Sequence, residues 1–569
     1  MSNKVFRAIS SHRGAVVAVT ALALTGVACP ALAEEVDATT ATDVPTVAEA
    51  ASSEGDAIVS TEWGDVTARQ EDASTNAAGT WSASRDVSSM WSLTRSLGIQ
   101  DAWSQGITGD DVTVAVIDTG IAPVRGLTTA PDQVVDGPDL SFDNHLEGSR
   151  YYDEFGHGTH MAGIVAGRDA DWSATSPAPG QFAGVAPEAQ LLNMKVGAGD
   201  GGVDVSQVIA ALDWVVEHRD AGGMDVRVVS LAYGTVSLQP SQVDPLARAV
   251  ENAWRAGIVV VASAGNDGLE TDHLLMPALS PHILAVGAVD PRSTDDRADD
   301  VVADFTNGGN DERRPDVVAP GRSVVSLRVP GSYADVTSPE GRVEGDLSER
   351  YFRGSGTSQA TAFVAGQVAL LLQQRPDLTP DQVKTLLMST ARPLAGNEPA
   401  MGAGVPDVLA AVAAPAPGDA PTTDAPFSSG LGSLDAARGD ARVVDPDSGT
   451  VLEGEQDAQG QPWDAAAWVA ATASGGAWDG GTWNGRTWTG DELVAGAWEY
   501  APWTGTSWSG ATWEDRHTAE STWEARSWRN DGWEARSWRE DSWEARSWRE
   551  DSWEARSWRQ DSWEARSWR

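Results

Sequence analysis

The sequence predicts an α/β fold between residues 91 and 414: a doubly wound parallel sheet with helices on both faces, followed by a repetitive C-terminal tail. Short apolar runs, typical of strands buried on both faces, alternate there with stretches of helical spacing. The apolar runs are Val112 to Ile117, Gln190 to Val196, Val226 to Tyr233, Ile258 to Ala264 and Ile283 to Val289. The helical stretches are Ser206 to Arg219, Pro245 to Arg255, Ser358 to Gln374 and Pro380 to Thr390. Ligands of such a sheet collect at the carboxyl ends of its strands.

Residues 1–33 have the pattern of an export signal. Basic residues precede an apolar segment, Ala15 to Ala28, which ends near the small-x-small site at Ala31-Leu32-Ala33. The apolar segment is short for a membrane span, and no later stretch is long and apolar enough to cross a bilayer. Cleavage would also remove Cys29, the single cysteine, so no disulfide framework is expected. We therefore expect a secreted protein, extracellular or associated with the cell surface, without a transmembrane segment in the mature chain.

Residues 34–90 are rich in Ala, Ser, Thr and acids and have no sustained apolar periodicity. We expect a disordered spacer or a short propeptide, because such a segment can bury little apolar surface. The whole chain carries a formal charge of −43. That charge would repel phosphates, which argues against nucleic acid as a partner and favours a strongly hydrated surface.

The C-terminal part divides into a linker and a repeat. Residues 415–462 are rich in Pro, Ala, Gly and Asp, and we expect an extended linker there. From Trp463 to Trp568, tryptophan recurs every five residues, at all of 22 positions except Ala473, Leu493 and Thr518. Low-order and solenoid-like structures both remain open for residues 463–569. Exposed indoles there could bind cell-wall glycan or drive self-association, and a merely tolerated expansion is the alternative.

Four polar residues follow or precede the predicted strands and helices where a buried sheet would not need them. Asp118 ends the first strand, His157 opens an apolar helix between two glycines, Asn266 follows the strand that ends near Ala264, and Ser358 precedes the longest helix. Each alone fits a turn or a helix cap. Together, at one edge of one sheet, they supply an acid, a base, an oxyanion donor and a nucleophile.

Three motifs resemble the signatures of the subtilisin-like serine proteases, in that family's chain order of Asp, His and Ser. The motifs are Asp118-Thr119-Gly120, Gly156-His157-Gly158-Thr159-His160 and Gly356-Thr357-Ser358-Gln359-Ala360. The resemblance extends from Trp91 to Ala414 and does not cover either flank. It implies an exported serine-type endopeptidase that hydrolyses peptide bonds in proteins through an acyl-enzyme intermediate.

The resemblance also implies a role for each polar residue. Ser358 is expected to be the nucleophile, His157 the base, and Asp118 the group that orients His157. The Asn266 side chain is expected to help form the oxyanion hole. His160 competes with His157 as the base, and the family pattern makes it a packing neighbour.

Substrate-binding residues are expected on two segments, again by resemblance. Residues 230–234 (Ser230, Leu231, Ala232, Tyr233 and Gly234) should form an edge strand that pairs with an extended peptide, opposite the loop from Val196 to Gly202. Ala264 and Gly265 complete the set. Ala232 and Tyr233 stand where glycines are frequent in the family, and Gln359 and Ala362 where methionine and proline are frequent.

No cofactor is required for this chemistry. Structural calcium is frequent in the family, and the acids Asp136, Asp139 and Asp143 form a candidate group, with solvated surface acids as the alternative. A second function class is a surface-binding protein in which the tryptophan repeat binds and the protease-like domain is an inert scaffold. The combination of Asp118, His157, Asn266 and Ser358 favours the enzyme.

Overall fold

The computed structural model describes residues 80–144, 149–396, 398–439, 441–443 and 451–488, and the backbone of two further short strands. These strands are β14 (Leu493–Val494) and β15 (Ala497–Trp498). The expected export signal, residues 34–79 and most of the tryptophan repeat lie outside the described residues.

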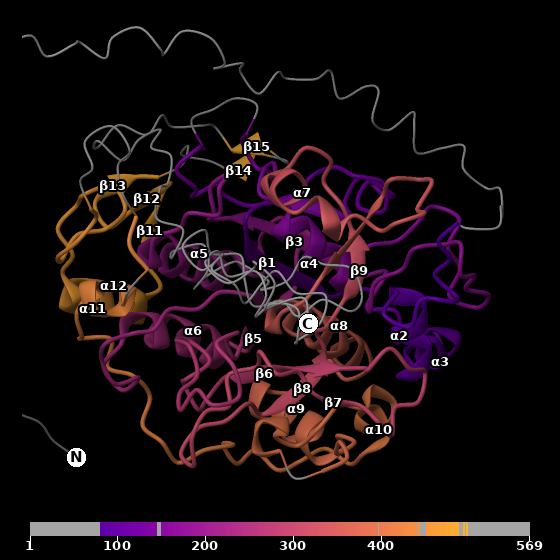
Figure 1. Cartoon of the computed structure of the whole chain (residues 1–569). Coiled ribbons are helices and arrows are strands. Elements are labelled where there is room, and N and C mark those ends of the chain that lie inside the picture. Colours follow the sequence, from indigo (N-terminus) through magenta and orange to yellow (C-terminus); the bar gives the residue numbers. More distant parts are fainter. Residues whose placement is uncertain are drawn as a thin grey trace, which may run out of the picture. The chain divides into compact units, whose positions relative to one another are not determined.

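The main sheet has the strand order β2-β3-β1-β4-β5-β6-β7, with β8 also paired to β6 (Figure 1). All its pairings are parallel except that of β6 with β7. Its strands are β1 (Thr113–Asp118), β2 (Val134–Asp136), β3 (Gln190–Lys195), β4 (Val226–Leu231), β5 (Val259–Ser263), β6 (Leu284–Asp290), β7 (Val301–Val302) and β8 (Val317–Pro320). Every residue of β1 and β5 is buried, as expected for strands covered on both faces.

Helices pack against this sheet in two pairs, α4 against α8 and α5 against α6. The longer helices are α4 (His157–Ala166), α5 (Val205–His218), α6 (Pro245–Arg255), α8 (Thr357–Gln374), α9 (Pro380–Ser389) and α12 (Ala465–Ser474). The shorter helices are α2 (Met90–Ser96), α3 (Ile99–Ser104), α7 (Tyr333–Thr337), α10 (Val408–Ala413) and α11 (Leu434–Arg438). Single 3₁₀ turns are η1 (Ala221–Gly223), η2 (Pro339–Gly341) and η3 (Pro399–Met401). The predicted doubly wound α/β fold is confirmed.

Three small antiparallel sheets accompany the main one, and the shortest pairs β14 with β15. The first pairs β9 (Val324–Leu327) with β10 (Tyr351–Gly354), and β10 leads directly into the start of α8. The second joins β11 (Trp478–Asp479), β12 (Thr482–Trp483) and β13 (Arg486–Thr487). Among the described residues, no helix has both the length and the apolar character needed to span a bilayer.

The structured domain begins before the expected boundary at residue 91. The Trp81 ring lies 5.0 Å from that of Tyr351, and the Trp81 indole donates to Asp86 at 2.7 Å. Asp86 in turn pairs with Arg353 on β10 at 2.6 Å. These contacts with a strand far along the chain hold residues 80–90 on the domain, although the composition of this segment is that of a spacer.

The expectation of an extended linker at 415–462 is wrong for the part of it that the structure describes. Residues 427–439, 441–443 and 451–488 fold against the domain, and we call them the C-terminal strap. In Figure 1 its elements α11, α12 and β11–β13 lie beside α5, and α11 and β11 contact that helix. Backbone groups of the strap pair with residues 238–251, for example Ser429 N–H with the Gln242 carbonyl at 2.8 Å. The composition of a segment indicates how weakly it folds by itself and does not indicate whether it packs against another part of the chain.

The first tryptophans of the five-residue repeat are buried within this strap. Trp463, Trp468, Trp478, Trp483 and Trp488 are each at most 7% exposed. Their rings pack on one another, with centroids 5.2 to 5.7 Å apart for four of the five. For these copies the indoles form a small core against the domain and are not the exposed rings that glycan stacking would need.

Candidate active site

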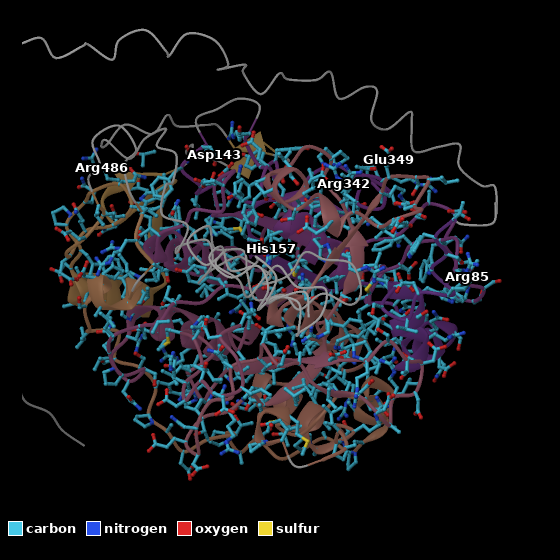
Figure 2. The ribbon with its side chains drawn as sticks, in the orientation of Figure 1. Arg85, Asp143, His157, Arg342, Glu349 and Arg486 are labelled. Carbon is cyan, nitrogen blue, oxygen red and sulfur yellow. The ribbon has the colours of Figure 1, made fainter. Side chains whose placement is uncertain are left out.

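Asp118 and His157 meet at the carboxyl end of β1. Asp118 is the last residue of that strand and His157 is the first residue of α4. His157 Nδ1 lies 2.8 Å from Asp118 Oδ1 and 3.0 Å from Oδ2, and both side chains are buried. Figure 2 labels His157 at this position. A carboxylate on Nδ1 fixes the tautomer that places the other nitrogen, Nε2, ready to accept a proton.

The glycines around His157 are needed for this approach. Gly156 has φ 100°, a left-handed conformation that allows the chain to turn into α4. At Gly158 a Cβ would lie 2.1 Å from the Gly120 carbonyl oxygen. The Gly-His-Gly sequence therefore lets the start of α4 lie directly on the turn that follows Asp118.

Asp153 and Thr119 support this pair, although no role was expected for either from the sequence. Thr119 donates from its N–H to Asp118 Oδ1 at 2.8 Å and from its hydroxyl to Asp153 at 2.8 Å. Asp153 also accepts from the backbone N–H groups of Gly156 and Thr159 at the start of α4, each at 2.7 Å. Burial raises the pKa of Asp153, and these hydrogen bonds oppose the rise. The sequence signal for Asp153 was its position shortly before the start of a helix, where a negative charge is favourable.

Ser358 and Asn266 come together at the start of α8. Ser358 is the second residue of that helix and is 2% exposed. Asn266 follows β5, and its Oδ1 accepts from the Thr357 N–H at 2.8 Å and from the Thr357 hydroxyl at 3.0 Å. The amide of Asn266 is thereby held in one orientation beside the residue that precedes Ser358. The N–H groups at the start of α8 make this a favourable position for negative charge.

His160 lies on the same helix as His157 but in different surroundings. It is fully buried, and Ser326 of β9 donates to its backbone carbonyl at 2.8 Å. Burial holds the pKa of His160 well below its usual value, and the neighbouring His157 lowers it further. Such a group stays neutral, as expected of a packing residue.

The expectation of an edge strand at 230–234 is wrong for its first two residues. Ser230 and Leu231 belong to β4, and β4 pairs with β1 on one side and β5 on the other. The order of strands in a parallel sheet is set by long-range packing, which a single strand sequence does not reveal. Residues 232–234 extend beyond β4, and all three are buried.

The Tyr233 side chain has Asp204, Arg438 and Asp244 as charged neighbours. Its ring is fully buried, and Asp204 and Arg438 lie close enough to act on its hydroxyl. Burial raises the pKa of Tyr233 well above its ordinary value. The aromatic side chain that replaces a frequent glycine therefore packs toward α5 and the C-terminal strap.

The backbone groups of Ala264 and Gly265 form hydrogen bonds with other segments of the domain. The Ala264 N–H donates to Val286 at 2.9 Å, and its carbonyl accepts from Leu275 at 3.1 Å. The Gly265 N–H donates to the Thr357 hydroxyl at 3.3 Å, and φ is 115°. These two residues carry Asn266 to its place beside α8.

Two of the three candidate calcium acids, Asp139 and Asp143, lie near a lysine. Lys195, fully buried at the end of β3, lies 3.5 Å from Asp143 and donates to the Ser149 carbonyl at 2.7 Å. Asp139 and Asp143 are themselves buried, so the alternative of solvated acids is wrong for both. Burial raises the pKa of Asp136 to about 6. Within the described ranges, no three or more His, Cys, Asp or Glu side chains are arranged to hold a metal ion.

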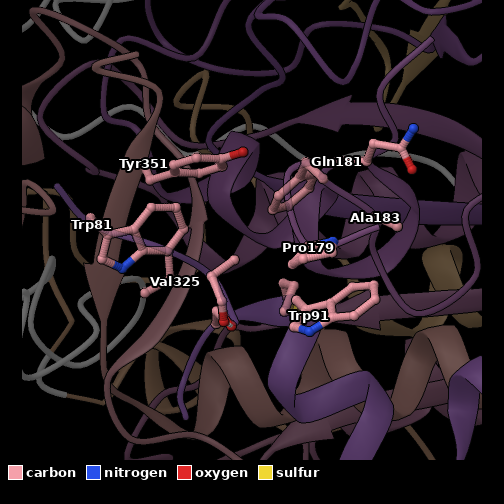
Figure 3. Close-up of a pocket in the computed structure, with 11 residues that line it drawn as sticks. Trp81, Trp91, Pro179, Gln181, Ala183, Val325 and Tyr351 are labelled. Atoms are coloured by element: carbon pink, nitrogen blue, oxygen red, sulfur yellow. Dashed lines mark hydrogen bonds between the residues drawn. The ribbon is translucent and has the colours of Figure 1, made fainter. Parts of the chain in front are cut away.

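A small aromatic pocket lies elsewhere on the domain (Figure 3). Trp81 and Tyr351 line one side of it and Trp91 another. Phe182 also lines the pocket, and its ring centroid lies 5.8 Å from that of Tyr351. None of the residues proposed for the site lines this pocket.

Comparison with known proteins identifies the family. Residues 109–406 match the Subtilase family. The chain belongs to the subtilases. This match contains Asp118, His157, Asn266 and Ser358 and ends before the C-terminal strap.

Three relatives from Bacillus subtilis (strain 168) illustrate the similarity of this subtilase to serine proteases. It is 40% identical to serine protease AprX over 290 residues, which cover 50% of the chain and 62% of AprX. It is 36% identical to subtilisin E over 310 residues, 54% of the chain and 67% of that relative. It is 30% identical to the major intracellular serine protease over 315 residues, which cover 52% of the chain and 83% of that relative. The match thus spans less than two thirds of AprX.

Proposed function

We propose that this subtilase is a secreted serine endopeptidase that hydrolyses peptide bonds in proteins with Asp118, His157 and Ser358. The observation that carries the proposal is the contact of 2.8 Å between His157 Nδ1 and a buried Asp118, in a chain of a serine protease family. The start of α8, with Ser358 and the oriented amide of Asn266, is the second component.

In the proposed mechanism, Ser358 Oγ attacks the carbonyl carbon of the scissile bond while His157 Nε2 takes the hydroxyl proton. Asp118 stabilises the imidazolium that results. His157 then gives its proton to the leaving amine, and an acyl-enzyme remains on Ser358. Water, deprotonated by His157, hydrolyses that ester and restores the serine.

The negative oxygen of each tetrahedral intermediate needs donors that are in place before the reaction. Asn266 suits this role because Thr357 holds its Oδ1, which fixes where the Nδ2 donors point. The Ser358 N–H at the helix start is the second donor proposed. No cofactor takes part in these steps, and calcium would act on stability alone.

The proposed location rests on the N-terminal sequence: basic residues, the apolar segment and the small-x-small site of residues 1–33 are typical of export. The proposed substrates are proteins or peptides. Binding to cell-wall glycan or self-association through the tryptophan repeat is proposed only for the copies after Trp488, because the earlier indoles are buried.

The test is cleavage of casein by the purified full chain and by its Ser358→Ala variant, each with and without calcium. The parent chain should release peptides, and the variant should lose at least about 10⁴-fold in rate, as serine proteases do when the nucleophile is removed. Equal activity of both chains, or no cleavage by the parent under either condition, would overturn the proposal.

A further inference from the structure

Two segments flank the carboxyl end of β1, where Asp118 and His157 meet. The first, residues 196–204, follows β3 and starts on the site itself, since the N–H groups of Val196 and Gly197 donate to the Asp118 carbonyl at 2.9 and 3.2 Å. It ends at Asp204, the N-cap of α5. The second, residues 232–235, follows β4. On the proposed function an extended peptide binds between these two segments, and we call them the cleft walls.

Arg438 of the C-terminal strap holds the far end of the first wall. Its Nε donates to Asp204 Oδ2 at 2.6 Å, and both side chains are fully buried. Asp204 also caps α5, accepting from the Ser206 N–H at 3.0 Å within a capping box. Arg438 further donates to the carbonyls of Gly454 and Gln456, so its guanidinium ties α5 to two parts of the strap.

The residue just before Arg438 holds the end of the second wall. The Thr235 hydroxyl donates to the Ala437 carbonyl at 2.7 Å, and the Leu238 N–H donates to the Ala436 carbonyl at 2.9 Å. The fit leaves no spare space, because a Cβ on Gly439 would lie 2.0 Å from the Val236 carbonyl oxygen. One turn of the strap, residues 436–439, therefore contacts the end of each wall, at Asp204 and at Thr235.

The tryptophan repeat holds the rest of α5. Trp478 donates from its indole to the Ala210 carbonyl at 2.9 Å, and Trp468 and Trp483 donate to Asp213 at 2.8 and 3.0 Å. Near the end of the helix, Glu217 accepts from the Ala477 N–H at 2.6 Å. The strap thus contacts α5 from its N-cap to its last turn.

We propose that the C-terminal strap positions both cleft walls, with Arg438 as the positioning residue, so that the enzyme recognises extended peptides only when the strap is docked. The strap lies outside the region matched to the family. In some proteins a buried polar or ionic group sets a unique geometry more than it adds net stability, and we assign that role to Arg438 and Asp204. The proposal rests on the proposed protease function.

The experiment uses the full chain and two substrates: a tetrapeptide anilide, which reaches the walls, and a small single-residue ester, which reaches only the nucleophile. Arg438→Met is compared with Arg442→Met, the same change at an arginine that pairs with Asp435 of the strap. Arg438→Met should lower kcat/KM for the anilide by about tenfold or more, mainly through KM, because small displacements of positioning groups have effects of this size. Ester hydrolysis, and both activities of Arg442→Met, should change less than about twofold.

Three outcomes would overturn the proposal. One is an unchanged anilide KM in Arg438→Met, and another is an equal loss on both substrates, which would indicate a purely structural role. The third is a parent chain that hydrolyses neither substrate. This result would overturn the proposed function as well, whereas the first two leave the parent chain active. If Arg438→Met does not fold, the same two substrates are compared for Thr235→Val. This change removes the hydroxyl that donates to the Ala437 carbonyl.

Discussion

We expect the stability that the docked strap gives the chain to depend on pH through Asp213. This carboxylate of α5 is buried, accepts hydrogen bonds from the indoles of Trp468 and Trp483, and has Glu217 as an acidic neighbour. Burial raises the pKa of Asp213 to about 7 against the two hydrogen bonds, which lower it. Among the described residues, no ion pair joins Asp213 to a basic side chain.

The sign and size of the effect follow from linkage. The folded chain holds the Asp213 proton more tightly than the unfolded chain, in which the pKa is near 3.8. Stability is therefore highest while the group is protonated, below about pH 3.8, and falls as the pH rises through about 7. The difference of about 3 pKa units corresponds to about 4 kcal/mol of unfolding free energy.

Replacing Asp213 by Asn should remove this pH dependence, because an amide oxygen still accepts from the indoles and does not ionise. We expect the stability of Asp213→Asn relative to the parent to improve by about 4 kcal/mol between pH 4 and pH 8. The measurement is chemical denaturation in a Ser358→Ala background, which prevents self-digestion. Asp220→Asn, at an exposed acid just after α5, is the control. A difference between parent and variant that stays constant with pH would refute the reasoning.

Three further substitutions have defined outcomes. Asn266→Leu should lower kcat by about 10² to 10³, the loss measured for an oxyanion-hole asparagine in subtilisin, a member of this family, with KM for a peptide substrate little changed. Gln359→Met should raise the unfolding free energy by about 1 to 3 kcal/mol in thermal or chemical denaturation, since both polar atoms of the buried Gln359 amide lack a hydrogen-bond partner among the described residues. Lys195→Met should lower the unfolding free energy by about 3 to 5 kcal/mol, because Asp139 and Asp143 would stay buried without their cation, and an unchanged denaturation midpoint would contradict this.

Much of the domain could be predicted from apolar periodicity. The run Val112 to Ile117 lies within one residue of β1, and the expected helix from Pro245 to Arg255 coincides with α6. These elements are buried on the sheet, so their packing requirements are visible in their own sequence. The contact of His157 with Asp118 was predictable because Asp118 ends a strand of the parallel sheet and His157 opens a helix expected at the same edge.

The features that escaped prediction depend on contacts between distant segments. The strap has the composition of a linker, yet Arg438 finds Asp204 more than two hundred residues earlier in the chain. The side chain of Tyr233 lies near that same pair. Its position just after a strand in the sequence gives no indication of this contact. Lys195 neutralises acids that, read alone, resemble a calcium site or a solvated surface. In each case the partner is supplied by tertiary structure.

The most direct test of the central claim is covalent labelling of the nucleophile. A fluorophosphonate probe forms a bond from phosphorus to an activated serine oxygen and releases fluoride. The full chain should gain one adduct by mass spectrometry, located on Ser358, and His157→Ala should lose the labelling while remaining folded. An unlabelled parent chain, an adduct on another residue, or equal labelling of the His157→Ala variant would contradict the account.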